Sequence, residues 1–324
     1  EDRCPPLHCV FLDEAQDLSP LQWDMFFYIE SKCARSYIAG DDDQTIYSFQ
    51  GASPKIFINL KGEFDPQVQS RRVPKSVHEL ATSIFPHMSQ RLEKEWRPRE
   101  AEGVVNMGSD FEELPLHEGN WMILTRTNKM LERLRDHLYS MNFRFEAKAQ
   151  ELLPKKMLNA YRVWKRLHQG AVVDKDEVKD LWDYLTVKDG HLIRGFSSGK
   201  TLENITSINL EGLKAEHGLR ATGSWEQLNF PESSKLYIKK LLESGDSLMK
   251  PARIKLSTIH GVKGEECDNV VLFTDIERII YESATRNPDP EHRLFFVGIT
   301  RAKERLYICS QHYEYQYNIG GPIV

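Results

Sequence analysis

Residues 8–22 read HCVFLDEAQDLSPLQ, an apolar run that stops abruptly at two adjacent carboxylates, Asp13 and Glu14. The segment 19–33 then opens with a Ser-Pro pair, which favours the start of a helix, and a second short apolar run follows at 36–39. This order of strand, helix and strand predicts a parallel α/β unit. In open parallel sheets ligands bind outside the carboxyl ends of the strands, and the acidic pair falls there.

The acidic pair allows two interpretations. A bare Asp-Glu after a strand is most often a solvated turn that caps the next helix. In nucleoside triphosphatases, however, the first acid of such a pair holds Mg²⁺ and a second positions or deprotonates the attacking water. The pair alone does not decide between the turn and the catalytic site, so other parts of the chain have to.

The composition narrows the class of protein. A chain of 324 residues is long enough for two or three domains. A net charge of -5 excludes a small basic module that binds nucleic acid by charge alone. The five cysteines are odd in number and lack C-x2-C spacing, which argues against a disulfide framework or a zinc site. Because no apolar run approaches 18 residues, we expect no membrane segment and a soluble, cytoplasmic protein.

The α/β pattern breaks off and later resumes. The charged, proline-containing stretch 91–103 predicts a domain junction, because its charges are not expected to be buried. We expect a helix at 74–90 before this stretch, and a strand at 121–127 and a helix at 129–141 after it. The pattern then disappears over 150–250, where we expect helices first and a region rich in Gly, Ser and charge afterwards. It resumes with strands at 252–261, 269–275 and 305–310 and a helix at 290–304.

Three further clusters carry residues suited to phosphate and nucleic-acid chemistry. In YIAGDDDQTIYSFQGASP (37–54) a strand ends in acids, a Gln that can sense a terminal phosphate, and aromatics that can stack on bases. TIHGVKGEECDNVVL (258–272) sets a His, a Lys and acids around glycines. EHRLFFVGITRAKERLYI (291–308) predicts a helix that presents an arginine finger. Taken singly, GDDD is more often a turn, IYSF is more often core packing, and a lone helical arginine is more often solvated.

In this order the clusters resemble the numbered motifs of superfamily 1 helicases of the UvrD/Rep/PcrA type. VFLDEAQD resembles motif II, GDDDQTIYSFQGA motif III and QSRRVPKSVHELA motif IV. WMILTRTN resembles motif IVa, STIHGVKGEE motif V and VGITRAKERL motif VI. The resemblance covers about residues 1–145 and 250–324.

This resemblance implies an α/β architecture of RecA-like P-loop NTPase folds. Residues 1–95 would form a partial first domain with motifs II, III and IV. Residues 96–149 and 251–324 would form a complete second domain, interrupted by a mainly helical, 2B-like insertion at 150–250. It also implies ATP as substrate, Mg²⁺ as cofactor, and 3′ to 5′ movement on single-stranded DNA and at single-strand/duplex junctions.

The resemblance implies roles for individual side chains. Asp13 would bind Mg²⁺, and Glu14 would be the general base for the attacking water. The expected contacts to the γ-phosphate come from Gln44, Arg72 and Arg301. Arg71 would contact adenine, and Glu266 would contact the ribose. Lys263 would couple the nucleotide site to the DNA. The expected contacts to DNA come from Tyr47, Phe49, Gln50, Thr258 and His260.

Three positions depart from the family pattern. Phe49 stands where the family usually has Trp, Gln50 where it has Arg, and Arg71 where it has an aromatic residue that stacks on adenine. A Phe ring and a guanidinium can both still stack on a base. Gln50 carries no charge, which alters the connection from motif III to DNA.

The family's phosphate loop, G-x-x-x-x-G-K-[ST], does not occur in the sequence. Its nearest match, GFSSGKT at 195–201, has three residues between its glycines where four are required, and we interpret it as a flexible loop. We therefore expect the chain to be the C-terminal portion of a longer helicase, without its N-terminal part, and to hydrolyse little or no ATP alone. A first sheet without its other strands is expected to expose apolar surface.

Two other functions stay open. A non-catalytic nucleic-acid-binding or scaffold protein with a degenerate helicase fold would also show Gln50, Arg71 and no phosphate loop. The complete set of metal-, water- and phosphate-contacting residues favours the helicase, because a scaffold has no chemical reason to keep them together. A helicase fused to a nuclease lacks the additional carboxylate cluster that a nuclease requires.

Overall fold

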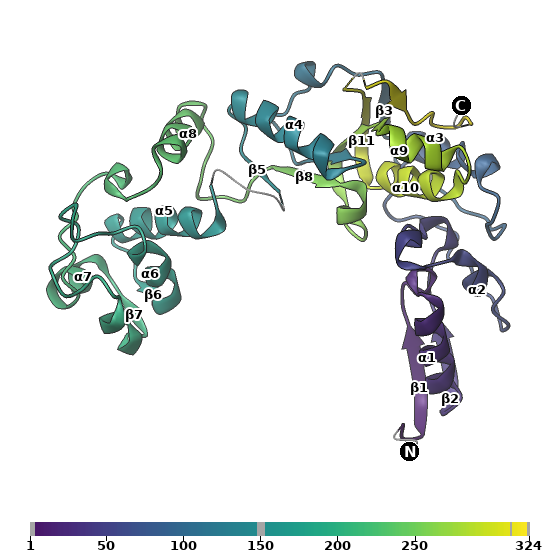
Figure 1. Cartoon of the computed structure of the whole chain (residues 1–324), viewed down its shortest axis with the longest axis horizontal. Coiled ribbons are helices and arrows are strands. Elements are labelled where there is room, and N and C mark those ends of the chain that lie inside the picture. Colours follow the sequence, from purple (N-terminus) through teal and green to yellow (C-terminus); the bar gives the residue numbers. More distant parts are fainter. Residues whose placement is uncertain (1–3, 148–152, 312, 323–324) are drawn as a thin grey trace. The chain divides into compact units, whose positions relative to one another are not determined.

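The computed structural model describes residues 4–147, 153–311 and 313–322 (Figure 1). The chain divides into two compact units. The first, here called the sheet unit, comprises Glu1–Leu134 and Ile254–Val324, and the second, the helical unit, comprises Arg135–Arg253. Each unit is described by itself. Among the described residues, no helix has the length and apolar character needed to cross a bilayer.

A parallel sheet forms the centre of the sheet unit. All pairings among its strands β3, β11, β9, β4 and β8 are parallel, in that spatial order. Every residue of β4 is buried, as expected for a central strand of a sheet that is covered on both faces. The predicted α/β fold class is therefore confirmed. The strands are β3 (Val104–Met107), β4 (Trp121–Thr125), β8 (Ile254–Thr258), β9 (Cys267–Phe273) and β11 (Ala302–Cys309).

Helix α10 (Asp289–Ile299) is the most deeply buried helix bounding this sheet, and its apolar side chains join those of β4, β9 and β11 in one core. The sequence predicted this helix to extend through residue 304. The structure ends it at Ile299, because β11 begins to pair with β9 at Ala302. Arg301 therefore lies in the turn between helix and strand, and the expectation of a helical Arg301 was wrong.

The other helices of the sheet unit are shorter. The helix predicted at 74–90 ends at Thr82, four residues before Pro86, which has no N–H to donate to the carbonyl of Thr82. Helix α4 continues from the sheet unit into the helical unit. The helices are α2 (Pro54–Ile58), α3 (Lys75–Thr82), α4 (Asn128–Ser140) and α9 (Arg278–Ala284).

Strands β1 (Leu7–Leu12) and β2 (Cys33–Ile38) form a separate parallel pair, joined by α1 (Pro20–Glu30), so the predicted strand–helix–strand unit is confirmed (Figure 1). Trp23 of α1 packs beneath the pair. On the other side, the rings of Phe11 and Tyr37 stack at 5.1 Å and are 77% and 50% exposed. The predicted exposed apolar surface is therefore present.

Short elements complete the sheet unit. β10 (Asp275–Ile276) pairs antiparallel with β12 (Tyr315–Gln316). Single 3₁₀ turns hold several loops in place. They are η1 (Ala15–Asp17), η2 (Asp42–Gln44), η3 (Ser48–Gln50), η4 (Phe85–His87), η5 (Phe111–Glu113) and η8 (Ile259–Val262).

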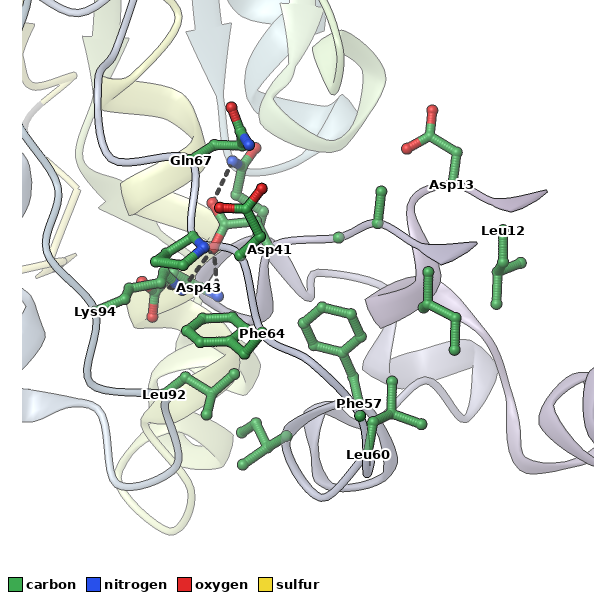
Figure 2. A pocket seen from close by; sticks show the side chains of 18 of the residues that line it. Leu12, Asp13, Asp41, Asp43, Phe57, Leu60, Phe64, Gln67, Leu92 and Lys94 are labelled. Carbon is green, nitrogen blue, oxygen red and sulfur yellow. Dashed lines mark hydrogen bonds and ion pairs between the residues drawn. The ribbon is translucent and has the colours of Figure 1, made fainter. Parts of the chain in front are cut away.

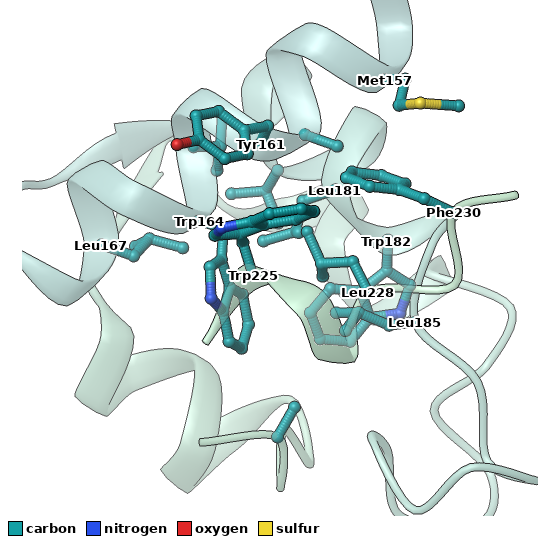
Figure 3. Close-up of a cluster of buried hydrophobic side chains, with 14 of the residues drawn as sticks. Met157, Tyr161, Trp164, Leu167, Leu181, Trp182, Leu185, Trp225, Leu228 and Phe230 are labelled. Atoms are coloured by element: carbon teal, nitrogen blue, oxygen red, sulfur yellow. The ribbon is translucent and has the colours of Figure 1, made fainter. Parts of the chain in front are cut away.

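The helical unit has its own hydrophobic core, in which Trp164, Trp182 and Trp225 are buried (Figure 3). Two of these indoles also tie loops to the core, because Trp164 donates to the carbonyl of Gly223 and Trp182 to that of Phe196. Its elements are β5 (Phe145–Glu146), α5 (Lys155–His168), β6 (Val173–Asp174), α6 (Lys175–Trp182), η6 (Lys200–Asn204), β7 (Ser207–Ile208), α7 (Leu210–Glu216), η7 (Trp225–Gln227) and α8 (Glu232–Glu243).

The structure of the helical unit bears on two expectations, one about the region rich in Gly, Ser and charge and one about the GFSSGKT stretch. The region rich in Gly, Ser and charge contains the helices α7 and α8, because leucines spaced among the polar residues reach the common core. The GFSSGKT stretch (195–201) lies between α6 and η6, and does not follow a strand of the parallel sheet. The likeness of this unit to a 2B subdomain, and the three predicted domain boundaries, stay predictions.

Candidate active site

Two acidic turns meet at the carboxyl ends of β1 and β2: the DEAQD turn (13–17) and the GDDDQ turn (40–44). Backbone bonds join them, since Ala15 donates to the carbonyl of Ala39 at 3.0 Å. The fully buried Gln16 joins them again. Its Oε1 accepts from the Asp41 N–H at 2.9 Å, and its Nε2 donates to Glu14 Oε2 at 2.6 Å. Gln16 was not among the predicted site residues, because no local sequence pattern reveals its buried contacts.

Glu14 has an uncommon backbone conformation. Its φ of 51° and ψ of 38° lie in the left-handed region, where among the described non-glycine residues only Asn142 also has positive φ. Such strain persists only where surrounding contacts hold it, and it is frequent at functional sites. Here the Glu14 carboxylate is held by Gln16 and by an ion pair with Lys263 at 3.3 Å. The conformation aims the predicted general base in a fixed direction.

Lys263, from the loop between β8 and β9, contacts both turns. Its ammonium forms an ion pair with Asp17 and donates to the carbonyl of Gln44 at 3.1 Å. It also lies over the ring of Tyr47, 5.6 Å from the centroid. The Lys263 side chain is only 8% exposed, and burial raises the pKa of Asp17 although the neighbouring Lys263 opposes that shift. Lys263 thus joins the β8–β9 loop to the DEAQD and GDDDQ turns.

Arg301 reaches the GDDDQ turn from the turn after α10. Its Nη2 donates to Gln44 Oε1 at 3.3 Å, and other donors reach the carbonyls of Val297 at 2.8 Å and Glu265 at 3.2 Å. Arg301 is 1% exposed, and burial, helped by the nearby positive charge of Arg72, lowers its pKa to about 9. The structure therefore brings together Gln44 and Arg301, which were both predicted to contact the γ-phosphate.

Arg72 lines a cavity beside the two acidic turns. Its Nη1 is 3.9 Å from Glu266 Oε2, and burial lowers the pKa of its guanidinium. The buried Nε atom of Arg72 finds no hydrogen-bond partner within the described part of the chain. Arg71 differs, because it is exposed and does not line the cavity. The structure thus places Arg72 and Glu266 together and leaves Arg71 outside.

The cavity has a volume of about 2020 Å³ and different chemistry at different points of its wall (Figure 2). Carboxylates and cations come from the strand ends and from residues 72 and 94. Apolar side chains come from the segment 55–64. Polar lining residues include Asp13, Asp41, Asp43, Gln44, Arg72, Lys94 and Thr300, and apolar ones include Leu12, Phe57, Leu60 and Phe64.

Asp13 suits a magnesium ion. Its carboxylate is exposed at the cavity wall, and its Oδ1 accepts from the Glu14 N–H at 2.9 Å. Mg²⁺ is usually bound by one or two carboxylates while keeping waters and substrate phosphate oxygens as further ligands. A single accessible carboxylate at the end of β1 fits that mode of binding.

The aromatic residues of motif III meet the histidine of motif V. The ring centroids of Tyr47 and Phe49 are 6.0 Å apart, and those of Phe49 and His260 are 5.5 Å apart. Phe49 is 68% exposed. Burial and the positive charge of Arg126 lower the pKa of His260 to about 4, so this imidazole is neutral at pH 7. We call Tyr47, Phe49 and His260 the aromatic platform.

The two remaining predicted DNA contacts support this platform. The Gln50 side chain is exposed, and its backbone N–H donates to the carbonyl of Tyr47 at 2.9 Å. Thr258 Oγ1 accepts from the Gly261 N–H at 3.3 Å and caps the turn that carries His260. Thr258 therefore positions His260, and its direct contact with DNA stays a prediction.

The 91–103 stretch is not a solvated segment throughout. Lys94 and Arg91 are 19% and 17% exposed and form ion pairs with the carboxylates of the GDDDQ turn. The expectation that its charges remain unburied was wrong for these two residues. Oppositely charged partners at hydrogen-bond distance offset the cost of burying them.

The fold and this site define a structural class of protein. It is an α/β protein with a RecA-like parallel sheet and acidic residues at strand ends. Residues 5–65 match the family model of the UvrD/REP helicase N-terminal domain. Residues 226–313 match that of the UvrD-like helicase C-terminal domain. Both matches are to domains of UvrD/Rep-type superfamily 1 helicases, which confirms the resemblance seen in the motifs.

Curated relatives agree with this assignment. A probable DNA helicase of Mycoplasma pneumoniae is 21% identical over 94% of this chain and 44% of its own length. A probable DNA helicase II homolog of Mycoplasma capricolum is 20% identical over 95% of this chain and 56% of the relative. DNA helicase II of Haemophilus influenzae is 30% identical over 32% of this chain and 15% of the relative. The chain spans about half the length of the first two relatives.

Proposed function

We propose that this chain forms part of an ATP-dependent DNA helicase that moves 3′ to 5′ along single-stranded DNA. One observation carries the proposal: Arg301 and Lys263 from the β8–β11 region bond directly to Gln44 and Glu14 of the two acidic turns. A site assembled across these segments changes shape when a ligand binds to it. That is what a motor requires if nucleotide binding is to move one segment against another.

The catalytic roles follow from the positions of the side chains. Asp13 would hold Mg²⁺, and the ion would neutralise charge on the phosphates. Glu14, fixed by Gln16 and Lys263, accepts a proton from the attacking water or orients it. The strained backbone of Glu14 keeps its carboxylate in place before substrate arrives.

Gln44 and Arg301 bind the terminal phosphate. Arg301 donates to Gln44 Oε1 at 3.3 Å, and a phosphate oxygen that enters here would take over this donor. Gln44 would then contact the phosphate through its amide N–H, which donates to Asp41 in this structure. Arg301, which is buried, acts on the phosphate with little screening by water, so its charge is more effective there than at the surface. Arg72, whose buried Nε is without a partner in the described residues, adds a second guanidinium.

The aromatic platform binds single-stranded DNA. A neutral imidazole, a phenol and an exposed phenyl ring offer stacking surfaces for bases of any sequence. The platform is connected to the nucleotide site through Lys263, which contacts both Tyr47 and Glu14. Closing of the nucleotide site is therefore transmitted to the DNA through a single side chain.

The sequence carries no phosphate loop, and backbone N–H groups that surround the β-phosphate are needed for tight nucleotide binding. We therefore propose that this chain alone hydrolyses little or no ATP, and that a segment with such a loop completes the site. The same observation favours a second candidate, a nucleic-acid-binding scaffold with a degenerate helicase fold. The scaffold binds DNA but gains no ATPase activity when a phosphate loop is supplied.

Fluorescence anisotropy with a labelled oligo-dT tests the DNA-binding part of the proposal. Phe49→Ala should weaken binding about tenfold, because stacking on one base contributes about 1–3 kcal/mol. Tyr28→Ala, which removes a half-exposed aromatic ring of α1, is the matched control and should leave the affinity unchanged. Equal affinities for wild type and Phe49→Ala would refute the assignment of the platform.

A further inference from the structure

Lys94 lies outside every helicase motif of the chain, yet it contacts the three carboxylates of motif III. We propose that Lys94 is an internal cation that occupies the position of a metal ion among Asp41, Asp42 and Asp43, and that it fixes the orientation of Gln44 through Asp41. Lys94 is thus a positioning residue. The link to Gln44 rests on the proposed function, because it matters only if Gln44 contacts the terminal phosphate.

The geometry of the cluster is that of a coordinated cation. Lys94 Nζ is 2.9 Å from Asp41 Oδ1 and 3.0 Å from Asp43 Oδ2 (Figure 2). It also forms an ion pair with Asp42. Oxygens of the three carboxylates lie within 4.8 Å of one another, a spacing that suits a divalent cation. The ammonium group fills this space with a single positive charge.

The charges of the cluster need this cation. Asp42 and Asp43 are each 1% exposed. Asp43 is balanced by Arg91, which donates to both of its carboxylate oxygens at 3.0 and 3.1 Å. Among the described residues, the other donor to the Asp42 carboxylate is the Leu92 N–H, at 2.7 Å. Without Lys94, the cluster holds three carboxylates against one guanidinium.

The titration behaviour agrees with this geometry. Burial alone would lower the pKa of Lys94, but the three carboxylates raise it well above its ordinary value. Burial alone would raise the pKa of Asp41, but Lys94 and the amide of Gln44 hold it below its ordinary value. Both groups therefore stay charged at neutral pH.

Asp41 transmits the position of Lys94 to Gln44. Asp41 Oδ1 accepts from Lys94, while its Oδ2 accepts from Gln44 Nε2 at 2.6 Å. Because the amide nitrogen of Gln44 is held on this side, its oxygen faces the opposite way, toward Arg301 Nη2 at 3.3 Å. Asp41 Oδ1 also accepts from the Asp43 N–H at 3.2 Å. Loss of Lys94 would leave this oxygen with that longer bond, so the Asp41 carboxylate, and with it Gln44, would be held less firmly.

The chain around Lys94 is anchored on both sides. The Arg91 guanidinium lies 3.8 Å from the centroid of the Phe85 ring. Arg293 of α10 donates to the carbonyl of Asp42 at 3.0 Å and to that of Gln90. Lys94 is therefore delivered to the cluster by a segment bonded both to the GDDDQ turn and to α10.

The test compares the wild-type chain with Lys94→Met, Lys94→Arg and the double variant Lys94→Met/Asp42→Asn. Lys239→Met, which removes a half-exposed lysine paired with Glu226, is the control. Two readouts are used: the side-chain NH₂ resonances of Gln44 in ¹⁵N-labelled protein, and the melting temperature with and without Ca²⁺. Neither readout requires ATP hydrolysis.

In Lys94→Met we expect the Gln44 NH₂ resonances to shift and broaden, and Ca²⁺ to raise the melting temperature more than in wild type. Lys94→Arg should retain part of the wild-type spectrum. Asp42→Asn should restore part of the stability that Lys94→Met loses, because it removes one buried charge.

If Lys94→Met does not fold, the double variant decides through its Gln44 resonances. Unchanged Gln44 resonances in a folded Lys94→Met or double variant overturn the proposal, as does a Ca²⁺ effect no larger than in wild type. If wild type shows the ordered Gln44 signal but the chain joined to a phosphate-loop segment binds ATP without hydrolysing it, the proposed function falls and the role of Lys94 stands.

Discussion

The Arg301 guanidinium makes four hydrogen bonds inside the protein, although it is the side chain proposed to meet a phosphate. Three of these bonds hold the guanidinium against the C-terminal end of α10 and the loop before β9. A bound phosphate would replace the fourth bond, to Gln44. The site is thus prepared by residues whose charges are buried and satisfied before any ligand arrives. The rigidity of such residues reduces the reorganisation needed during the reaction.

Arg301→Lys tests this arrangement. An ammonium group cannot reach all four acceptors, so buried oxygens including Gln44 Oε1 lose a donor, and the free energy of unfolding should fall by about 2 kcal/mol. Urea denaturation measures the change. Arg305→Lys makes the same chemical replacement at an exposed position and should change stability by less than about 0.5 kcal/mol. Equal effects of the two variants would show that the bonds of Arg301 contribute nothing special.

His292 gives a pH-dependent prediction. It is 1% exposed beneath Tyr317, whose hydroxyl is 2.7 Å from its Nδ1. Burial lowers the pKa of His292 to about 4, and electrostatic repulsion from His87 and Arg293 contributes to this shift. The negative charge of Asp289 opposes the shift. The unfolded chain, with a pKa near 6.5, therefore binds more protons between these values. The contribution of neutral His292 to stability is fully present above about pH 6.5 and is lost as the pH falls through 4.

His292→Gln removes this titration. The decline in the free energy of unfolding from pH 7 to pH 4.5 should become shallower by about 2–3 kcal/mol in the variant. His260, whose pKa is also lowered to about 4, keeps part of the slope in place. Chemical denaturation at a series of pH values measures the slope, and parallel curves for variant and wild type would refute the assignment.

Sequence reasoning found the residues whose chemistry is visible in a motif and missed those that act by position. Gln44 and Arg301 lie 257 positions apart in the chain, and the motif order brought them into one predicted site, as the structure does. Gln16 and Lys94 were missed because each acts through a buried contact that no local pattern reveals. Arg71 is exposed and lies outside the cavity, so its contact with adenine stays a prediction.

At the scale of elements, helix and strand ends decide where the chemistry lies. The pattern predicted β1, α1 and β2 well, because a Ser-Pro helix start and short apolar runs are local signals. The end of α10 was predicted five residues late, because the pairing of β11 with β9 is non-local and interrupts a sequence with good helix propensity. The helices α7 and α8 were missed because few of their residues show an uninterrupted apolar face.

The start of α1 supports a prediction at this scale. The Gln22 side-chain oxygen accepts from the Ser19 N–H at 2.8 Å and lies 2.9 Å from the Ser19 hydroxyl, which closes a capping box. Gln22→Ala should destabilise the β1–α1–β2 segment by about 1 kcal/mol. Hydrogen exchange of the amides of α1 measures this locally. Unchanged protection in the variant would show that the cap does not hold the helix.

At the scale of the whole molecule, the sequence predicted the α/β class and the family, and the parallel sheet and the two family matches confirm both. The sequence pattern did not predict the internal structure of the helical unit. The core of this unit depends on tryptophans and leucines spread over about a hundred residues with no regular spacing. Non-local burial of this kind is the part of a fold that patterns along a chain specify least.

The central claim is that the acidic turns, Lys263 and Arg301 form one site for ATP hydrolysis once a phosphate loop is present. The most direct test joins this chain to a segment of a UvrD-like relative that carries G-x-x-x-x-G-K-[ST] and measures ATP hydrolysis with and without single-stranded DNA. The account predicts DNA-stimulated hydrolysis that Glu14→Gln reduces at least about 100-fold. A folded chimera that binds ATP without hydrolysing it, or one whose rate survives Glu14→Gln, would contradict the account.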